Sequence, residues 1–338
     1  MQYDKPFKTY SQQIEILKSR GITVYAEDKL NEHILSTVSY YSLINGYKEE
    51  LLDKRCNFER FKKEFTIERL YNLHLFDSEL QGIVFKYVIA VENSLKTKLS
   101  YLVARDYGVH QDNFLDKKHY KNPGSSKADL VSGTISSIKK ELKNTKNNPT
   151  KFYRDGDAKT GKPPKNHIPP WIIIKNIYFS TSVNWYKILK GNKKDEIVNQ
   201  MLFSKNNALT PDEKKELFAA CLRILHQYRN NTAHGNRSIT LLEHAKLPRH
   251  LVAKEYGTDM ASKNDGATLL DVLIATIILS DDVNRRRLLN EISTYLKLTK
   301  KHIPYLIKYL MSISKITDKI ISTLEQIDNP LVKNIDSN

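Results

Sequence analysis

The 338-residue chain contains few of the residues that build disulfide-rich, turn-rich or membrane-spanning proteins. Its two cysteines, Cys56 and Cys221, stand alone and predict neither a disulfide framework nor a zinc site. Glycine (12) and proline (11) are sparse, which favours long helices joined by short connections over a sandwich of strands. The longest apolar stretch, Leu269–Leu279, contains Asp271 and is too short to span a bilayer. We therefore expect an all-α protein of the reducing cytoplasm, without a membrane contact.

Recognisable cofactor motifs are also absent from the sequence. It contains neither a glycine-rich phosphate loop nor a convincing metal-ligand spacing, so we expect no cofactor and no metal. The first residues lack the apolar core of a signal peptide, which agrees with a cytoplasmic location.

Positive charge is what the chain has in excess. Its 54 Lys and Arg residues against 38 Asp and Glu residues give a net charge of +16. Such a surplus favours a polyanionic partner, because neutralising phosphates releases condensed counterions. A lysine-rich solvated surface would carry the same charge, so the charge alone suggests RNA without establishing it.

The surplus is concentrated in residues 117–165, which hold 13 basic residues against four acidic ones. We interpret this region as a basic, mobile insertion with a short helix around Leu130–Leu142, either a loop that grips RNA or a solvated excursion. The predicted RNA contacts are Lys117, Lys118, Lys121, Lys139, Lys140, Lys143 and, further along the chain, Arg237.

Helical periodicity dominates the rest of the sequence. Thr9 and Gln12 form a capping box, and Thr210-Pro211-Asp212-Glu213 is a clear helix start. Apolar residues between Thr66 and Tyr107 recur at three- and four-residue steps, which predicts two helices, or one kinked near Asp77–Ser78. The predicted organisation is an N-terminal helical segment, a central helical domain with the basic insertion, and a C-terminal helical extension, covering residues 1–48, 49–245 and 246–338.

The helix that starts at Thr210 ends in a run of polar residues, Arg229-Asn230-Asn231-Thr232-Ala233-His234. Asn230 and His234 share a helix face, and Gly235 suits the helix stop. Arginine and histidine are common at helix ends because they complement the helix dipole, so this spacing alone is weak evidence for catalysis. A polar run after an apolar helix, in a basic chain, strengthens the catalytic interpretation.

These residue types suit RNA cleavage. A histidine that titrates near its ordinary pKa of about 6.5 can exchange protons with a 2′-hydroxyl or a leaving 5′-oxygen, which is the role predicted for His234. Arg229 can hold the phosphate, and Asn230 can orient the imidazole or hold an RNA oxygen. One chain supplies one such histidine, whereas two subunits that meet at this helix end would supply two.

Several blocks of the sequence, in this order, resemble the abortive-infection proteins of the AbiD/AbiF type, within the HEPN superfamily. The resemblance covers about the first 240 residues. The Tyr40–Tyr47 block is similar to the family's YYxLxGY signature, although it can also be aromatic core. Arg229–His234 is similar to its RN-x-x-x-H ribonuclease motif. The remaining blocks are Lys5-Pro6-Phe7, Val91–Thr97 and Pro170-Trp171.

The resemblance implies a HEPN-type helical bundle that forms a homodimer through the motif helix. It implies a metal-independent endoribonuclease that leaves 2′,3′-cyclic phosphate and 5′-hydroxyl ends and acts as a phage-defence toxin. It also implies restraint by a structured small RNA. Glu92 is the candidate buried acid that supports Arg229 or His234, and Asn231 is a second supporting residue. Lys96 departs from the family pattern, which has arginine at this position.

Two other functions remain open from the sequence. The chain can be a catalytically inactive RNA-binding protein of the same fold, whose RNA binding does not depend on Arg229 or His234. It can also be a helical interaction scaffold whose positive charge is incidental.

Overall fold

The computed structural model describes residues 4–24, 28–45, 47, 51–62, 65–124, 129–144, 149–233, 237, 242, 244–259, 266–314 and 320–328. In these residues the chain is helical, with no strand and only isolated bridges such as Thr23 to Thr66. The all-α prediction is confirmed.

The helices follow one another as short and long elements. The first part of the chain forms α1 (Tyr10–Ser19), α2 (Asp28–Thr37), the π-helix η1 (Tyr41–Asn45), α4 (Ile67–Tyr107), α5 (Gln111–Phe114) and the 3-10 turn η2 (Lys117–His119). The middle forms α6 (Leu130–Leu142), α7 (Pro149–Asp155), α8 (Pro170–Ile173), α9 (Phe179–Ile188), α10 (Gly191–Met201) and α11 (Pro211–Ala233). The last part forms α12 (Arg249–Tyr256), α13 (Leu269–Leu279), α14 (Asp282–His302), α15 (Pro304–Ser314) and α16 (Ile320–Asp328).

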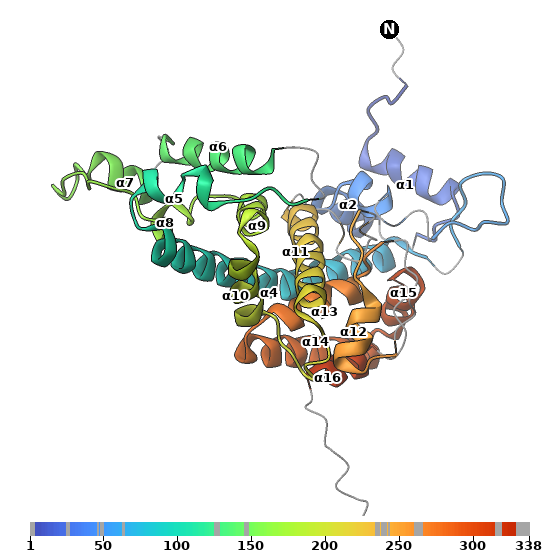
Figure 1. Cartoon of the computed structure of the whole chain (residues 1–338). Helices are drawn as coiled ribbons and strands as arrows, with labels where there is room; N and C mark the ends of the chain where they lie inside the picture. The colour runs from blue at the N-terminus through green and yellow to red at the C-terminus, as the bar shows by residue number, and fades with distance from the viewer. Residues whose placement is uncertain are drawn as a thin grey trace, which may run out of the picture.

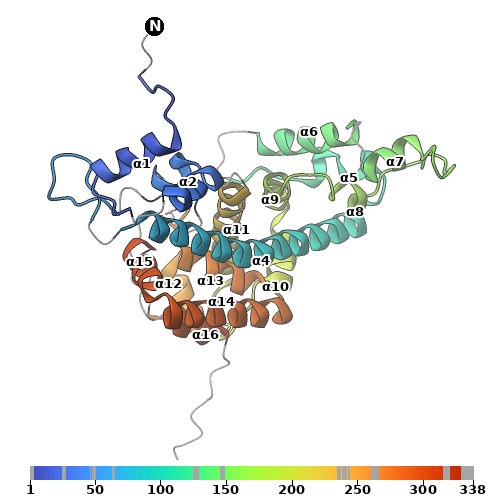
Figure 2. The same ribbon diagram turned by 180° about the vertical axis from the view of Figure 1, so that it is seen from behind.

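Helix α4 runs through the whole molecule, as Figure 1 shows. Its 41 residues correspond to about 60 Å of helix. Thr66 caps its start by accepting from the Arg69 amide at 3.1 Å, and Gly108 ends it with a φ of 90°. Helices α1 and α2 lie over its first half and α5 to α8 over its far end, with α14 and α16 on the opposite side (Figures 1 and 2). Most other helices are therefore arranged around α4.

The length of this segment predicted two helices or one kinked helix, and the structure has one continuous helix, so the two-helix alternative is wrong. Asp77 belongs to a residue type that favours caps and turns over helix interiors. In the structure its carboxylate is buried inside the fold and accepts a hydrogen bond from the Tyr47 hydroxyl at 3.3 Å. Tertiary contacts thus keep Asp77 in the helix against its local preference.

Residues 117–165 form more structure than a mobile loop. Helix α6 has the predicted bounds, and Val131, Ile135 and Ile138 on its inner face are buried. This face packs against α9, so the exposed lysines of α6 occupy the outer face. The prediction of a loop insertion is corrected to an insertion that contains packed helices.

Helix α13 lies in the middle of the hydrophobic core. It is apolar on all sides, and packs against α11, α4, α14 and α16. Its buried Asp271 closes a capping box with Thr268, and also accepts from Arg249 Nε at 2.9 Å and Nη2 at 2.8 Å. The chain after residue 246 therefore shares one core with the motif helix, while the predicted domain boundaries stay predictions.

A buried carboxylate fixes the loop that leads into α11. Glu255 Oε1 accepts from the hydroxyl of Ser204 and from the amides of Lys205, Asn206 and Asn207, at 2.7–3.1 Å. Its Oε2 accepts from two further loop amides at 2.9 and 3.2 Å. Burial raises the pKa of Glu255, but the hydrogen bonds outweigh that effect and hold the pKa below its ordinary value.

We expect Glu255→Gln to destabilise the protein by about 3 kcal/mol at neutral pH, because an amide cannot accept from all six donors. The loss should appear as a lower midpoint in urea unfolding. The wild type's extra stability should be present above the carboxyl's unfolded pKa and vanish as the pH falls through the lower folded value. Equal stability of the two proteins at neutral pH would contradict this role of the carboxylate.

Candidate active site

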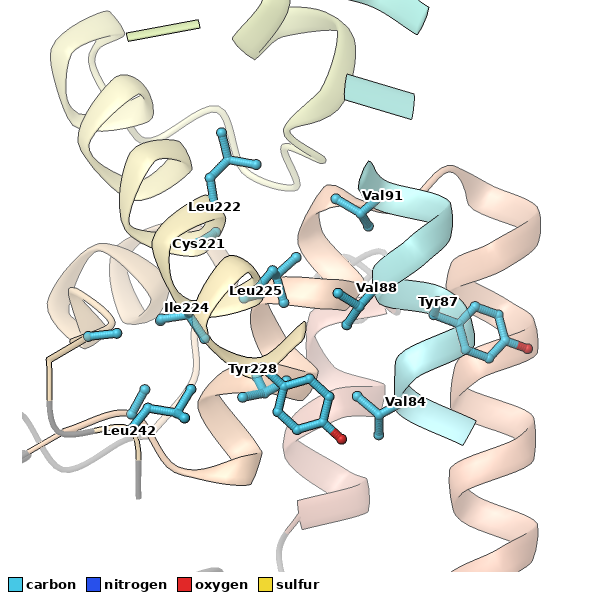
Figure 3. Packing of buried hydrophobic residues seen from close by; sticks show 14 of the residues in the cluster. Val84, Tyr87, Val88, Val91, Cys221, Leu222, Ile224, Leu225, Tyr228 and Leu242 are labelled. Carbon is cyan, nitrogen blue, oxygen red and sulfur yellow. The ribbon is translucent and has the colours of Figure 1, made fainter. Parts of the chain in front are cut away.

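Helix α11 carries the polar motif and is fixed at both its start and its apolar face. Thr210 Oγ1 accepts from the Glu213 amide at 3.3 Å, and Glu213 Oε2 accepts from the Thr210 amide at 2.8 Å, so the predicted helix start is closed by a capping box. In Figure 3 the side chains of Leu225 and Tyr228 point toward Val84 and Val88 of α4. The end of α11 is therefore held against the middle of α4.

A charged cluster lies beside this apolar contact between α4 and α11. Glu92 of α4 lies with its Oε2 3.6 Å from Arg229 Nε and its Oε1 2.7 Å from Lys96 Nζ. Only 7% of the Glu92 side chain is exposed, against 31% for Arg229. The structure thus brings Arg229 and Glu92 together, which helix periodicity cannot reveal.

The cluster retains a positive charge. Two cations share one carboxylate, so one unit of positive charge is left in a partly buried place, where an anion is stabilised more than in water. Arg229 approaches Glu92 most closely through Nε. The terminal nitrogens of an arginine are the ones that bind a phosphate in a fork. Lys96, which departs from the expected arginine, supplies the second cation.

Asn230 meets a histidine that the sequence analysis did not select. Its Nδ2 lies 2.9 Å from Nε2 of His226, one turn earlier on α11. The amide N–H donates to an unprotonated Nε2, so the contact requires the neutral ring with its proton on Nδ1. The His226 ring also packs edge-on against Phe179 of α9, with 5.9 Å between ring centroids. The four-residue spacing between His226 and Asn230 was the available signal.

The surroundings of His226 favour its neutral form. Burial lowers its pKa most, and the positive charges of Lys187 and Arg229 lower it further, while the Glu92 carboxylate opposes them. The pKa therefore lies below the ordinary value, and the ring is uncharged at neutral pH. The pKa of His226 is therefore sensitive to the charges of Arg229 and Glu92.

His234 lies outside the described residues, and α11 is described as far as Ala233. Asn231 is half-buried there, and the neighbouring Thr232 hydroxyl donates to the Tyr228 and Arg229 carbonyls at 3.0 and 3.1 Å. The catalytic role of His234 and the supporting role of Asn231 stay predictions.

Arg237, a predicted RNA contact, packs on the Tyr40–Tyr47 block. Its guanidinium carbon lies 4.9 Å from the centre of the Tyr47 ring. The Tyr47 side chain is buried, as are Leu43 and Ile44, whereas Tyr41 is exposed. The Tyr40–Tyr47 block therefore contributes to the core and also contacts Arg237.

The predicted RNA-contacting lysines of the insertion are all exposed and lie on η2, α6 and the adjoining chain. Lys117 Nζ donates to Ser132 at 2.7 Å, and Lys118 pairs with Asp116 at 2.9 Å. Lys121 is tied to the end of α9 through its backbone amide, which donates to the Ile188 carbonyl at 2.8 Å. RNA binding by these residues stays a prediction.

Comparison with known proteins identifies a family. Residues 33–240, more than half of the chain, match the family model described as Abi-like protein. No curated protein and no solved structure matches the chain. Among the described residues, no three or more His, Cys, Asp or Glu side chains gather as a metal site, and no helix has the length and apolarity to cross a membrane.

The pKa of His226 should respond in opposite directions to two neighbouring substitutions. Glu92→Gln removes a negative charge and should lower the pKa, whereas Arg229→Gln removes a positive charge and should raise it. Titration of the imidazole carbons by nuclear magnetic resonance measures both shifts. Shifts of the same sign in the two variants would contradict the described cluster.

Proposed function

Because this chain belongs to the Abi-like protein family, we propose that it acts in abortive infection as a metal-independent endoribonuclease. The family match supports the role in abortive infection. The finer assignment, to the AbiD/AbiF type and the HEPN superfamily, rests on the sequence blocks that end in Arg229-Asn230 and His234.

The observation that carries the proposal is the arrangement around Glu92. A carboxylate this deeply buried needs a partner, and here it holds the Nε edge of Arg229 while Lys96 adds a second cation. The side chain that would bind the scissile phosphate is thereby pre-oriented, with positive charge to spare. A purely structural ion pair would need only one of these cations.

In the proposed reaction, the 2′-oxygen of a ribose attacks the adjacent phosphorus as the bond from phosphorus to the 5′-oxygen breaks. A base accepts the 2′-hydroxyl proton, and an acid delivers a proton to the leaving 5′-oxygen. The products are a 2′,3′-cyclic phosphate and a 5′-hydroxyl, and no water or oxidant is consumed. His234 performs the proton transfer, while Arg229 stabilises the charge that grows on the phosphate oxygens.

One chain provides one His234, whereas the reaction has two proton transfers. We infer that two chains associate through the ends of their α11 helices, so that one histidine acts as base and its counterpart as acid. This C2 arrangement is the simplest way for identical subunits to build a composite site. A structured small RNA that restrains the toxin fits the net charge of +16 and completes the proposal.

We expect His234→Ala to lower the rate of RNA cleavage by about 100-fold to 10,000-fold, the usual contribution of a positioned acid or base. Purified proteins, washed at high salt to remove bound RNA, are incubated with labelled RNA in EDTA. Sequencing of 5′-hydroxyl ends after induced expression identifies the cleaved sites. Wild-type protein alone should produce new ends and arrest growth.

His33→Ala is the matched control, because it removes an exposed imidazole from α2 and should cleave like wild type. Equal cleavage by the wild type and His234→Ala would refute the assigned role. If the salt-washed wild type leaves RNA intact yet binds it tightly, the inactive RNA-binding alternative replaces the nuclease.

A further inference from the structure

Two cations lie on neighbouring helices that pack together beside the candidate active site. Lys187 lies in the last turn of α9, Arg223 lies in the middle of α11, and the two helices pack together. We propose that Lys187 and Arg223, called here the cation pair, form a phosphate-binding subsite that holds the RNA backbone next to Arg229. The choice of RNA as the ligand rests on the proposed function.

Neither member of the cation pair is neutralised by the protein. Among the described residues, no carboxylate forms an ion pair with Lys187 or Arg223, although other cations of this region are paired. Lys215 lies near Asp195 at 3.0 Å and Asp212 at 2.9 Å, and Arg105 pairs with Glu196 at 2.8 Å.

Burial affects one member of the cation pair, because Lys187 is partly buried whereas Arg223 is exposed. Lys187 is half-buried, and burial, followed by the positive charge of Arg223, lowers the pKa of its ammonium group. A lysine on a solvated surface would turn away from an arginine and remain in water. A phosphate between the two groups would offset both the desolvation and the repulsion, and it would accept charge-assisted hydrogen bonds from each.

The cation pair is continuous with the candidate active site. Arg223, His226 and Asn230 recur on one face of α11, and Arg229 lies about 9 Å along the axis from Arg223. Lys187 and Arg229 both act on His226, which lies between them and is neutral. A neutral His226 ring avoids adding a further positive charge. It leaves an uncharged polar group between the cation pair and Arg229. One RNA strand can therefore contact both the cation pair and Arg229.

Further lysines lie near the cation pair on the side away from Arg229. Lys121 is joined by its backbone to the end of α9, next to Lys187. Burial, and then the charges of Lys215 and Lys121, lowers the pKa of half-buried Lys194 on α10. The cation pair thus lies between Arg229 and a second group of lysines. We expect RNA to follow this path, along α9 and α11.

The test measures RNA binding in a His234→Ala background, where the proposed cleavage does not consume the probe. The probe is a fluorescein-labelled single-stranded RNA of mixed sequence, followed by anisotropy at several KCl concentrations. Lys187→Gln with Arg223→Gln should weaken binding about 5-fold near 0.1 M KCl, and reduce the slope of log K against log salt by about 0.7, because one phosphate is no longer neutralised.

Two further variants make the result specific. Lys297→Gln with Lys301→Gln removes the same charge from the exposed face of α14, across α4 from α9, and should change binding little. Lys187→Arg with Arg223→Lys keeps both charges and should retain most of the affinity. Circular dichroism and thermal unfolding verify that each variant is folded.

The subsite is overturned if removing the cation pair weakens binding no more than the α14 control does. It is also overturned if polyglutamate of equal charge competes as well as unlabelled RNA, since the surface would then suit acidic proteins. Cleavage separates this outcome from failure of the nuclease. If His234→Ala loses cleavage but the cation-pair variant binds RNA as before, only the subsite is refuted. If His234→Ala cleaves like wild type but the cation-pair variant binds RNA more weakly, only the nuclease is refuted.

Discussion

The buried carboxylate of Glu92 is the constraint on which the geometry of this molecule depends. It lies between α4 and α11, and a shift of either helix by one turn would separate it from Arg229, while Lys96 on its own helix would stay beside it. Such pairs add little net stability, because desolvation offsets the attraction. Loss of one of its two cationic partners disfavours other registers, and this favours the observed position of Arg229.

The position of α11 also depends on residues outside the family match. The match ends at residue 240, yet one face of α11 packs against α13, and Glu255 of α12 holds the loop that precedes α11. A buried helix that is apolar on all sides cannot be left exposed, so α13 and the motif helix need each other. The C-terminal helices therefore belong to the support of the candidate site rather than to an appendage.

Features with local causes were predictable from the sequence, and those with distant causes were not. The caps at Thr9 and Thr210 and the bounds of α6 follow from neighbouring residues, and all three predictions were confirmed. Asp77 lies inside the continuous helix α4, where its carboxylate accepts a hydrogen bond from the Tyr47 hydroxyl. A helical sequence pattern cannot predict this contact. The contact of Glu92 with Arg229 joins two helices far apart in the sequence. His226 was missed because a histidine on a helix face is common without a role.

Net charge shows that a basic protein can bind RNA, but burial distinguishes one cation from another. Exposed lysines of the insertion, such as Lys117, keep their charged groups in water, so their presence alone does not indicate a bound ligand. Lys187 has given up part of its hydration beside Arg223, and no described carboxylate compensates. An arrangement that is unfavourable in the free protein becomes favourable when an anion occupies it. The uncompensated cation pair, rather than the larger lysine count of the insertion, therefore marks where phosphate binds.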